Sequence, residues 1–229
     1  MGDLMSHDTH PETSPAVELL TQVLQRAHIQ TWDVVLIGDG SGSTWEAPCG
    51  WATTLIDATA PPDDNRWVYF GAASQGSVNL AELMPYLMAL TCYHHARGEA
   101  RLKVKCPLEV HIITDSQVTA GHGQRAANPI QDLPRVPQRA LWAGIREFAR
   151  LGYNFHWHWA PRSTSSLNVL ADLVAAIGRR ELIRIGKQPT PHPLAANAAA
   201  VMRAAQELAF ADPETGQLID VRMLNPLPG

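Results

Sequence analysis

The stretch VVLIGDGSGSTWEAPCGWATTLID, residues 34–57, contains the pattern that decides the fold. Two runs rich in apolar and β-branched residues, roughly 33–41 and 49–57, flank the turn-prone segment SGSTWEAP. A third such run, 66–74, follows the turn-prone segment ATAPPDDN. Runs of this length and composition are typical of strands, and short connections join antiparallel neighbours. The sequence therefore predicts an antiparallel meander of three strands.

Helical and strand patterns follow the meander along the chain. The run LEVHIIT is almost uniformly apolar, which is typical of a central strand that is covered on both faces. The predicted elements are, in order, a helix at 79–97, a strand at 108–114, a short helix after Ser116, a loop at 124–137, a helix at 138–151, a strand at 154–159 and a helix from about 166 to 184.

Four acidic residues occupy distinctive positions in this pattern. Asp39 and Asp115 stand at the ends of apolar strands, and Glu82 and Asp172 stand inside helices. Strand ends and helix faces can bring such carboxylates together, where they repel one another unless they are protonated or share a cation. Hard oxygen ligands select Mg²⁺ or Mn²⁺, and such ions beside a phosphodiester support two-metal hydrolysis. Taken singly, Asp39 is also a common turn residue and Glu82 a common solvated charge.

The order and surroundings of these four acids resemble type 1 ribonuclease H, which cuts the RNA strand of RNA–DNA hybrids. The likeness covers about residues 33–180. The matching motifs are the glycine-rich turn after Asp39, Gly50-Trp51-Ala52, Asn79 three residues before Glu82, Thr114-Asp115-Ser116-Gln117, Trp157-His158-Trp159-Ala160-Pro161, and Asn168 four residues before Asp172. Each motif alone is weak, and their common order makes the resemblance specific.

The resemblance implies an α/β chain with a ribonuclease H-like fold, in which α-helices flank a five-stranded mixed β-sheet. It implies a catalytic domain over residues 31–185. Residues 1–30 would be an N-terminal extension, with a disordered start and then a helix from Ser14-Pro15. Residues 186–229 would be a linker, a second appended helix and a tail. The partners of these two extensions are not implied.

The resemblance also implies an endoribonuclease with two Mg²⁺ ions, for which Mn²⁺ can substitute, and with 5′-phosphate products. Asp39 would bridge the two ions, Asp115 and Glu82 would bind on one side, and Asp172 on the other. Arg162 stands where the best-known members carry a histidine, and it would act as a fixed cation rather than a base. The implied substrate-binding residues are Gly40, Ser41, Asn79, Gln117 and Asn168. Asn79 could equally cap its helix.

Two other functions remain open from the sequence. One is a nuclease of the same fold that acts on another nucleic acid, and the other is a non-catalytic nucleic-acid-binding or scaffold protein. The arginines near the predicted loop, Arg125, Arg135 and Arg139, are scattered and form no basic hybrid-gripping helix. Retention of all four carboxylates favours catalysis over a scaffold.

Composition is that of a globular protein, with 229 residues, 45% hydrophobic residues and a formal net charge of −4. This charge argues against indiscriminate binding to polyanions. The three cysteines show no paired metal-ligand spacing and indicate core thiols of a reducing compartment. The absence of a long apolar run and of a secretion signal predicts a soluble, cytoplasmic protein without membrane contact.

Two histidines, His156 and His158, alternate with tryptophans on one predicted strand and therefore point to one face. Two histidines at this spacing could bind zinc, but no cysteine or third histidine lies at an obvious partner spacing. The pattern favours a strand with a half-polar face.

Overall fold

The structure is a computed structural model. It describes residues 24–25, 28–42, 47–60, 66–126 and 138–161, positions 168, 171–172, 174–176 and 178–180, and residues 221–223.

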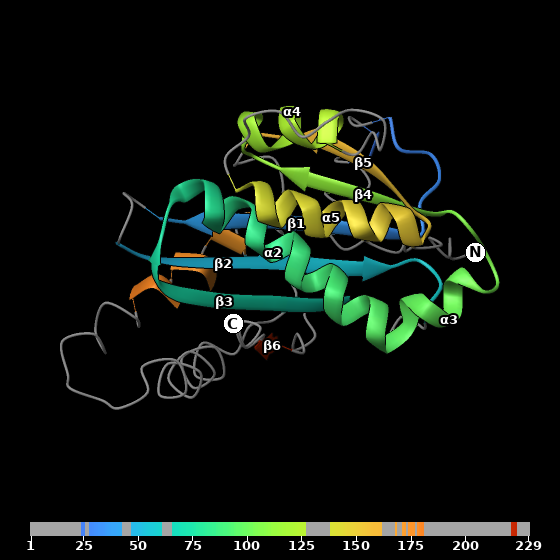
Figure 1. Cartoon of the computed structure of the whole chain (residues 1–229), viewed down its shortest axis with the longest axis horizontal. Coiled ribbons are helices and arrows are strands. Elements are labelled where there is room, and N and C mark those ends of the chain that lie inside the picture. The colour runs from blue at the N-terminus through green and yellow to red at the C-terminus, as the bar shows by residue number, and fades with distance from the viewer. Residues whose placement is uncertain are drawn as a thin grey trace, which may run out of the picture.

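One mixed sheet forms the centre of the molecule (Figure 1). Its strands are β1 Val34–Ser41, β2 Ala47–Asp57, β3 Arg66–Gly76, β4 Leu108–Thr114, β5 Tyr153–Trp159 and β6 Val221–Met223. They lie in the order β5-β4-β1-β2-β3-β6. The strands β1, β2 and β3 are antiparallel, whereas β4 and β5 run parallel to β1. The predicted meander and the five-stranded mixed sheet are thus confirmed.

The sixth strand, β6, pairs in parallel with β3 through the register Val68↔Val221 to Phe70↔Met223. Its residues fall in the segment for which the sequence predicts only a tail. A run of three residues is too short to show the alternating pattern of a strand, so the sequence does not indicate β6. Only its pairing with the edge of β3 defines it as a strand.

Two long helices, α2 Val78–Tyr93 and α5 Arg139–Leu151, cover one face of the sheet (Figure 1). A third helix, α4 Gln117–Ala126, lies beside β5. The single helix predicted over 79–97 is instead α2 followed by a π-helical turn, His94–Gly98, and the short helix α3 Glu99–Leu102. Ser77 caps α2 by accepting a hydrogen bond from the backbone N–H of Leu80, so the alternative that Asn79 is the N-cap is wrong.

The core lies mainly between the sheet and these helices, because alternate strand residues face them. Val34 and Leu36 of β1, and Val110 and Ile112 of β4, belong to the large core cluster with Trp142 of α5. On the opposite face, Val35, Ile37 and Ile113 form a smaller cluster with Trp32 packed against it. The described positions of 168–180 are helical, as predicted.

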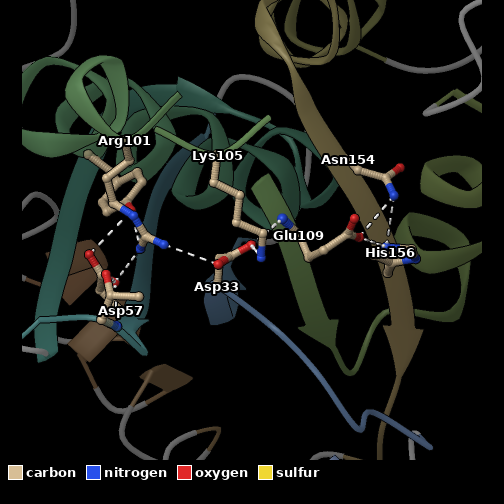
Figure 2. Close-up of polar contacts among 9 residues, drawn as sticks. Asp33, Asp57, Arg101, Lys105, Glu109, Asn154 and His156 are labelled. Atoms are coloured by element: carbon tan, nitrogen blue, oxygen red, sulfur yellow. Dashed lines mark hydrogen bonds and ion pairs between the residues drawn. The ribbon is translucent and has the colours of Figure 1, made fainter. Parts of the chain in front are cut away.

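A polar network ties the chain together at the start of β1 and the end of β2 (Figure 2). Arg101 of α3 contacts Asp57 at 2.6 Å and Asp33 at 3.0 Å, and Lys105 reaches Asp33 at 2.6 Å. Burial by itself raises the pKa of Asp33. The net shift is downward, because the carboxylate accepts hydrogen bonds from Lys105 and from the backbone N–H of Glu109 and lies near the cations Lys105 and Arg101. Both carboxylates are buried, so the cations are required to hold them in the fold.

Several predictions fall wholly or largely outside the described residues, among them most of the N-terminal helix, the linker and the second appended helix.

The three cysteines are described, and all three are free thiols. Cys49 is buried, but Cys106 is exposed, so the prediction of a core thiol is wrong for Cys106. No helix in the described part of the chain is long and apolar enough to cross a membrane.

Candidate metal and active site

The pairing of β1 with β4 places two of the predicted carboxylates side by side. These strands are parallel neighbours, and Gly38 lies opposite Thr114. Asp39 follows Gly38 and Asp115 follows Thr114, so the two carboxylates lie on the same side of the sheet, because side chains alternate along a strand. Strand β4 ends at Thr114, so Asp115 lies just beyond the carboxyl end of a parallel strand. Binding sites in α/β sheets collect at these carboxyl ends.

A glycine lets helix α2 bring Glu82 to the same edge. A Cβ atom at Gly40 would lie 2.4 Å from the carbonyl carbon of Ala81 and 2.5 Å from the amide nitrogen of Glu82. No side chain can occupy this space, so α2 lies directly against β1 at that point. The close approach of the two backbones explains why a glycine follows Asp39.

Asp39, Glu82 and Asp115 each offer a carboxylate oxygen, and these oxygens all lie within 4.8 Å of one another. Within the described residues this is the one such group of three or more histidine, cysteine, aspartate or glutamate side chains. Asp39 is 1% exposed and Glu82 is 7% exposed. Three carboxylates this close together, two of them buried and Asp115 half-buried, require neutralisation, and a donor set made only of oxygens suits a hard divalent cation.

Tyr86, one turn after Glu82 on α2, links the helix to both acid-bearing strands. Its hydroxyl lies 2.9 Å from the carbonyl oxygen of Gly38 and 3.2 Å from that of Ile113. The side chain is fully buried. Burial raises the pKa of Tyr86 well above its ordinary value, and the charges of the three carboxylates add to the rise. Tyr86 is therefore a neutral donor that fixes α2 against the two strand ends.

The backbone around Asp115 is held by three further contacts. Trp159 of β5 donates from its indole N–H to the carbonyl oxygen of Asp115 at 2.9 Å, although the residue is 47% exposed. The amide of Ala160 donates to the carbonyl oxygen of Thr114, and the Thr114 hydroxyl accepts from the amide of Ser116. The strand β5 thus positions the turn that presents Asp115.

The other predicted site residues differ in their exposure to solvent. Asp172 is half-buried and is not a member of the group within 4.8 Å. Asn79 and Gln117 are exposed in the first turns of α2 and α4, and Asn168 is 1% exposed. Ser41 ends β1 and is half-buried. Arg162 lies outside the described residues.

Sequence reasoning missed Tyr86 and Trp159. A signal for Tyr86 exists, because residues four apart on a helix share a face, and Tyr86 is four residues after Glu82. The role of Trp159 has no such signal. Its indole bonds to the carbonyl oxygen of Asp115, just after β4, and this contact depends on β4 and β5 being neighbours in the sheet.

The chain matches no protein-family model and no curated protein. It is similar to several solved structures. One is the N-terminal RNase H domain of a Mycobacterium tuberculosis protein, solved as a fusion with maltose-binding protein, at 17% identity and a TM-score of 0.44, covering 78% of this chain and 100% of that one. LC11-RNase H1 in complex with an RNA/DNA hybrid shows 15% identity and a TM-score of 0.46, covering 66% and 99%. RNase H1 from Halobacterium salinarum shows 19% identity and a TM-score of 0.43, covering 62% and 94%.

Proposed function

We propose that this chain is a metal-dependent endoribonuclease that hydrolyses the RNA strand of RNA–DNA hybrids and leaves 5′-phosphate products. The observation that carries the proposal is the convergence of Asp39, Glu82 and Asp115 within 4.8 Å at the carboxyl edge of β1 and β4. The motif order that resembles ribonuclease H supports the choice of substrate.

The convergence supports three of the proposed ligands, Asp39, Glu82 and Asp115, whereas Asp172 is proposed from the sequence resemblance. Asp39 would contact both of two Mg²⁺ ions, Asp115 and Glu82 would hold one of them, and Asp172 the other. When bound, such ions supply an activated water and stabilise charge on the leaving 3′-oxygen. The protein's own contribution is rigidity, because the Tyr86 hydroxyl and the Gly40 contact fix the helix that bears Glu82 relative to the strand that bears Asp39.

Exposed amide side chains are proposed to hold the hybrid. Asn79 and Gln117 begin two different helices and are open to solvent. An amide both donates and accepts, so each can bond to a ribose 2′-hydroxyl in the minor groove without reading sequence. Because Asn168 is buried, we assign it to support of the Asp172 helix rather than to direct contact. Arg162 is proposed from the sequence as a cation that stabilises charge on the phosphate.

A cleavage assay with three labelled substrates tests the proposal. RNA–DNA hybrid, duplex RNA and duplex DNA would each be incubated with the full chain in Mg²⁺, in Mn²⁺ and in chelator. We expect cleavage of the RNA strand of the hybrid alone, with either metal and not with chelator. Equal cleavage of duplex DNA would contradict the substrate assignment, and cleavage in chelator would contradict the metal assignment.

A further inference from the structure

A cluster of three histidines lies on the sheet face opposite α2 and α5. His111 of β4 is directly opposite His156 of β5, and His158 follows two residues later on the same side. Their strand neighbours Val110, Ile112, Phe155 and Trp157 face the large core, so the three imidazoles point the other way. His111 thus supplies the third histidine, which the spacing in the sequence does not indicate. It comes from the neighbouring strand β4 and lies 45 residues before His156 (156 − 111).

Two of the imidazoles face one another edge to edge. His111 Nδ1 lies 2.9 Å from His158 Nε2, whereas the ring centroids are 5.2 Å apart and the ring planes are inclined by only 11°. Such a contact holds one proton between two nitrogen lone pairs. His111 also hydrogen-bonds to the backbone of Thr31, which fixes its ring.

The third imidazole carries an acidic partner. His156 Nε2 lies 2.6 Å from Glu109 Oε2, and Asn154 Nδ2 lies 2.9 Å from the same oxygen (Figure 2). The His156 ring stacks beside His111 at 4.6 Å between centroids. A carboxylate bonded to one nitrogen of an imidazole fixes the tautomer and makes the other nitrogen a better metal ligand, and this arrangement recurs behind histidines that bind metals.

We propose that His111, His156 and His158 form a binding site for a divalent transition metal, with zinc as the expected ion and Glu109 as the residue that orients His156. Imidazole nitrogens suit zinc and its neighbours rather than Mg²⁺, so this site differs in chemistry from the carboxylate group. The metal takes the place of the proton shared by His111 Nδ1 and His158 Nε2, and that proton moves to the other nitrogen of the ring that carried it, so that both imidazoles remain neutral. The two ligand nitrogens then separate to roughly 3.3 Å for tetrahedral zinc.

Binding requires one rearrangement. In the present arrangement the nitrogen of His156 does not converge with the other two, since the cluster is not among the described groups whose ligand atoms all lie within 4.8 Å. The His156 side chain is 39% exposed, so its ring can turn without disturbing the core. Burial, followed by the neighbouring histidines, lowers the pKa of His111 to about 4, and burial also lowers the pKa of His158, so both rings are in the neutral form that binds metals.

Cobalt and zinc binding to the full chain without a polyhistidine tag tests this proposal. Excess Mg²⁺ would occupy the carboxylate group, Co²⁺ would be titrated by visible absorption, and Zn²⁺ by calorimetry. We expect one saturable site per chain with a tetrahedral Co²⁺ spectrum, at least tenfold weaker in His158→Ala and in His156→Ala. Glu109→Gln should weaken binding about ten- to a hundredfold, as loss of an orienting carboxylate does.

Two controls make the result specific to these positions. The chain has ten histidines, so His95→Ala, an exposed histidine on the π-helical turn, should bind as wild type does. Asp39→Asn should also leave the cobalt spectrum unchanged, which separates this site from the proposed nuclease centre. Should His158→Ala unfold, His158→Gln keeps a polar partner for His111 while removing the imidazole ligand. Unchanged affinity in either folded His158 variant, or no saturable binding in wild type, would overturn the proposal.

Discussion

A single buried hydroxyl connects the parts of the molecule that carry the three clustered carboxylates. Tyr86 reaches from α2 to the carbonyl oxygens of Gly38 and Ile113, which lie one residue before Asp39 and two residues before Asp115. Buried carbonyl groups that lose a donor cost stability, and an unfixed helix changes the ligand geometry. Tyr86 is therefore a positioning residue for the site.

Tyr86→Phe should lower the free energy of unfolding by about 1–2 kcal/mol and weaken Mn²⁺ binding by roughly tenfold. Urea denaturation and Mn²⁺ calorimetry measure the two effects. The control is Tyr153→Phe, which removes a hydroxyl bonded to His94 Nδ1 far along the chain from the carboxylates. That variant should lose stability without losing Mn²⁺ affinity, and an equal loss of affinity in both would show that Tyr86 has no special role.

Gly40 supports the site through its lack of a side chain. Gly40→Ala places a Cβ within 2.6 Å of backbone atoms of Ala81 and Glu82, which cannot move without shifting α2. We expect a loss of about 3 kcal/mol in unfolding free energy, at the upper end of overpacking effects, together with loss of cleavage. Thermal or urea melts and the hybrid assay measure this.

The matched control is Gly121→Ala on α4, where an added Cβ meets no atom within 4 Å. That change should stabilise the protein by about 0.5–1 kcal/mol, because alanine loses less conformational freedom in a helix. If Gly40→Ala behaved like Gly121→Ala, the close contact of α2 with β1 would be wrong.

At the residue level the sequence predicted the carboxylates better than their supports. Asp39 stands near the end of one apolar strand and Asp115 directly after another, both strands can be predicted from composition, and their parallel pairing makes the two acids neighbours. Tyr86 falls inside the helix predicted at 79–97, and its spacing from Glu82 indicates a shared face, but nothing in the sequence indicates that its hydroxyl bonds two backbone carbonyls. His111 was not connected with His156 and His158, since their proximity depends on strand register.

At the level of elements, the five predicted strands agree with the structure to within two residues at each end, whereas β6 was not predicted and the helix after β3 differs from its prediction. The apolar and turn-prone segments define β1, β2 and β3 locally. The π-helical turn at His94–Gly98 has no local signal, and it begins where Tyr153 contacts His94. The turn leads into α3, which delivers Arg101 to the buried carboxylates at the start of β1 and end of β2.

Arg101→Met should therefore destabilise the fold by about 2–4 kcal/mol, because it leaves the buried carboxylate of Asp57 without its cation. Asp33 keeps Lys105, which limits the loss. The nearby Lys103→Ala removes an exposed ion pair with Glu99 and should change stability by less than about 0.5 kcal/mol. Urea denaturation of both variants at neutral pH makes the comparison. Equal, small effects would show that the network does not hold α3 to the sheet.

For the whole molecule, the short strand β6 pairs with β3 and covers that edge of the five predicted strands. Truncation after Asp220 removes β6 and exposes the β3 backbone, so we expect a loss of about 1–3 kcal/mol in stability and a tendency to associate. Truncation after Met223 keeps β6 and is the control. Urea melts and light scattering measure the outcome, and hybrid cleavage should persist in both chains because no residue of the carboxylate group is removed. Identical behaviour of the two truncations would show that β6 contributes nothing.

The central claim is that the group formed by Asp39, Glu82 and Asp115 is the catalytic centre. Its most direct test is the initial rate of RNA-strand cleavage in a labelled hybrid with Mg²⁺, compared between wild type and Asp39→Asn, with Glu99→Gln as an exposed acidic control. We expect Asp39→Asn to lose roughly a thousandfold or more in rate while its melting temperature stays the same or rises, since one repelling charge is gone. Glu99→Gln should cleave as wild type does. A folded Asp39→Asn variant that cleaves at the wild-type rate would contradict the account.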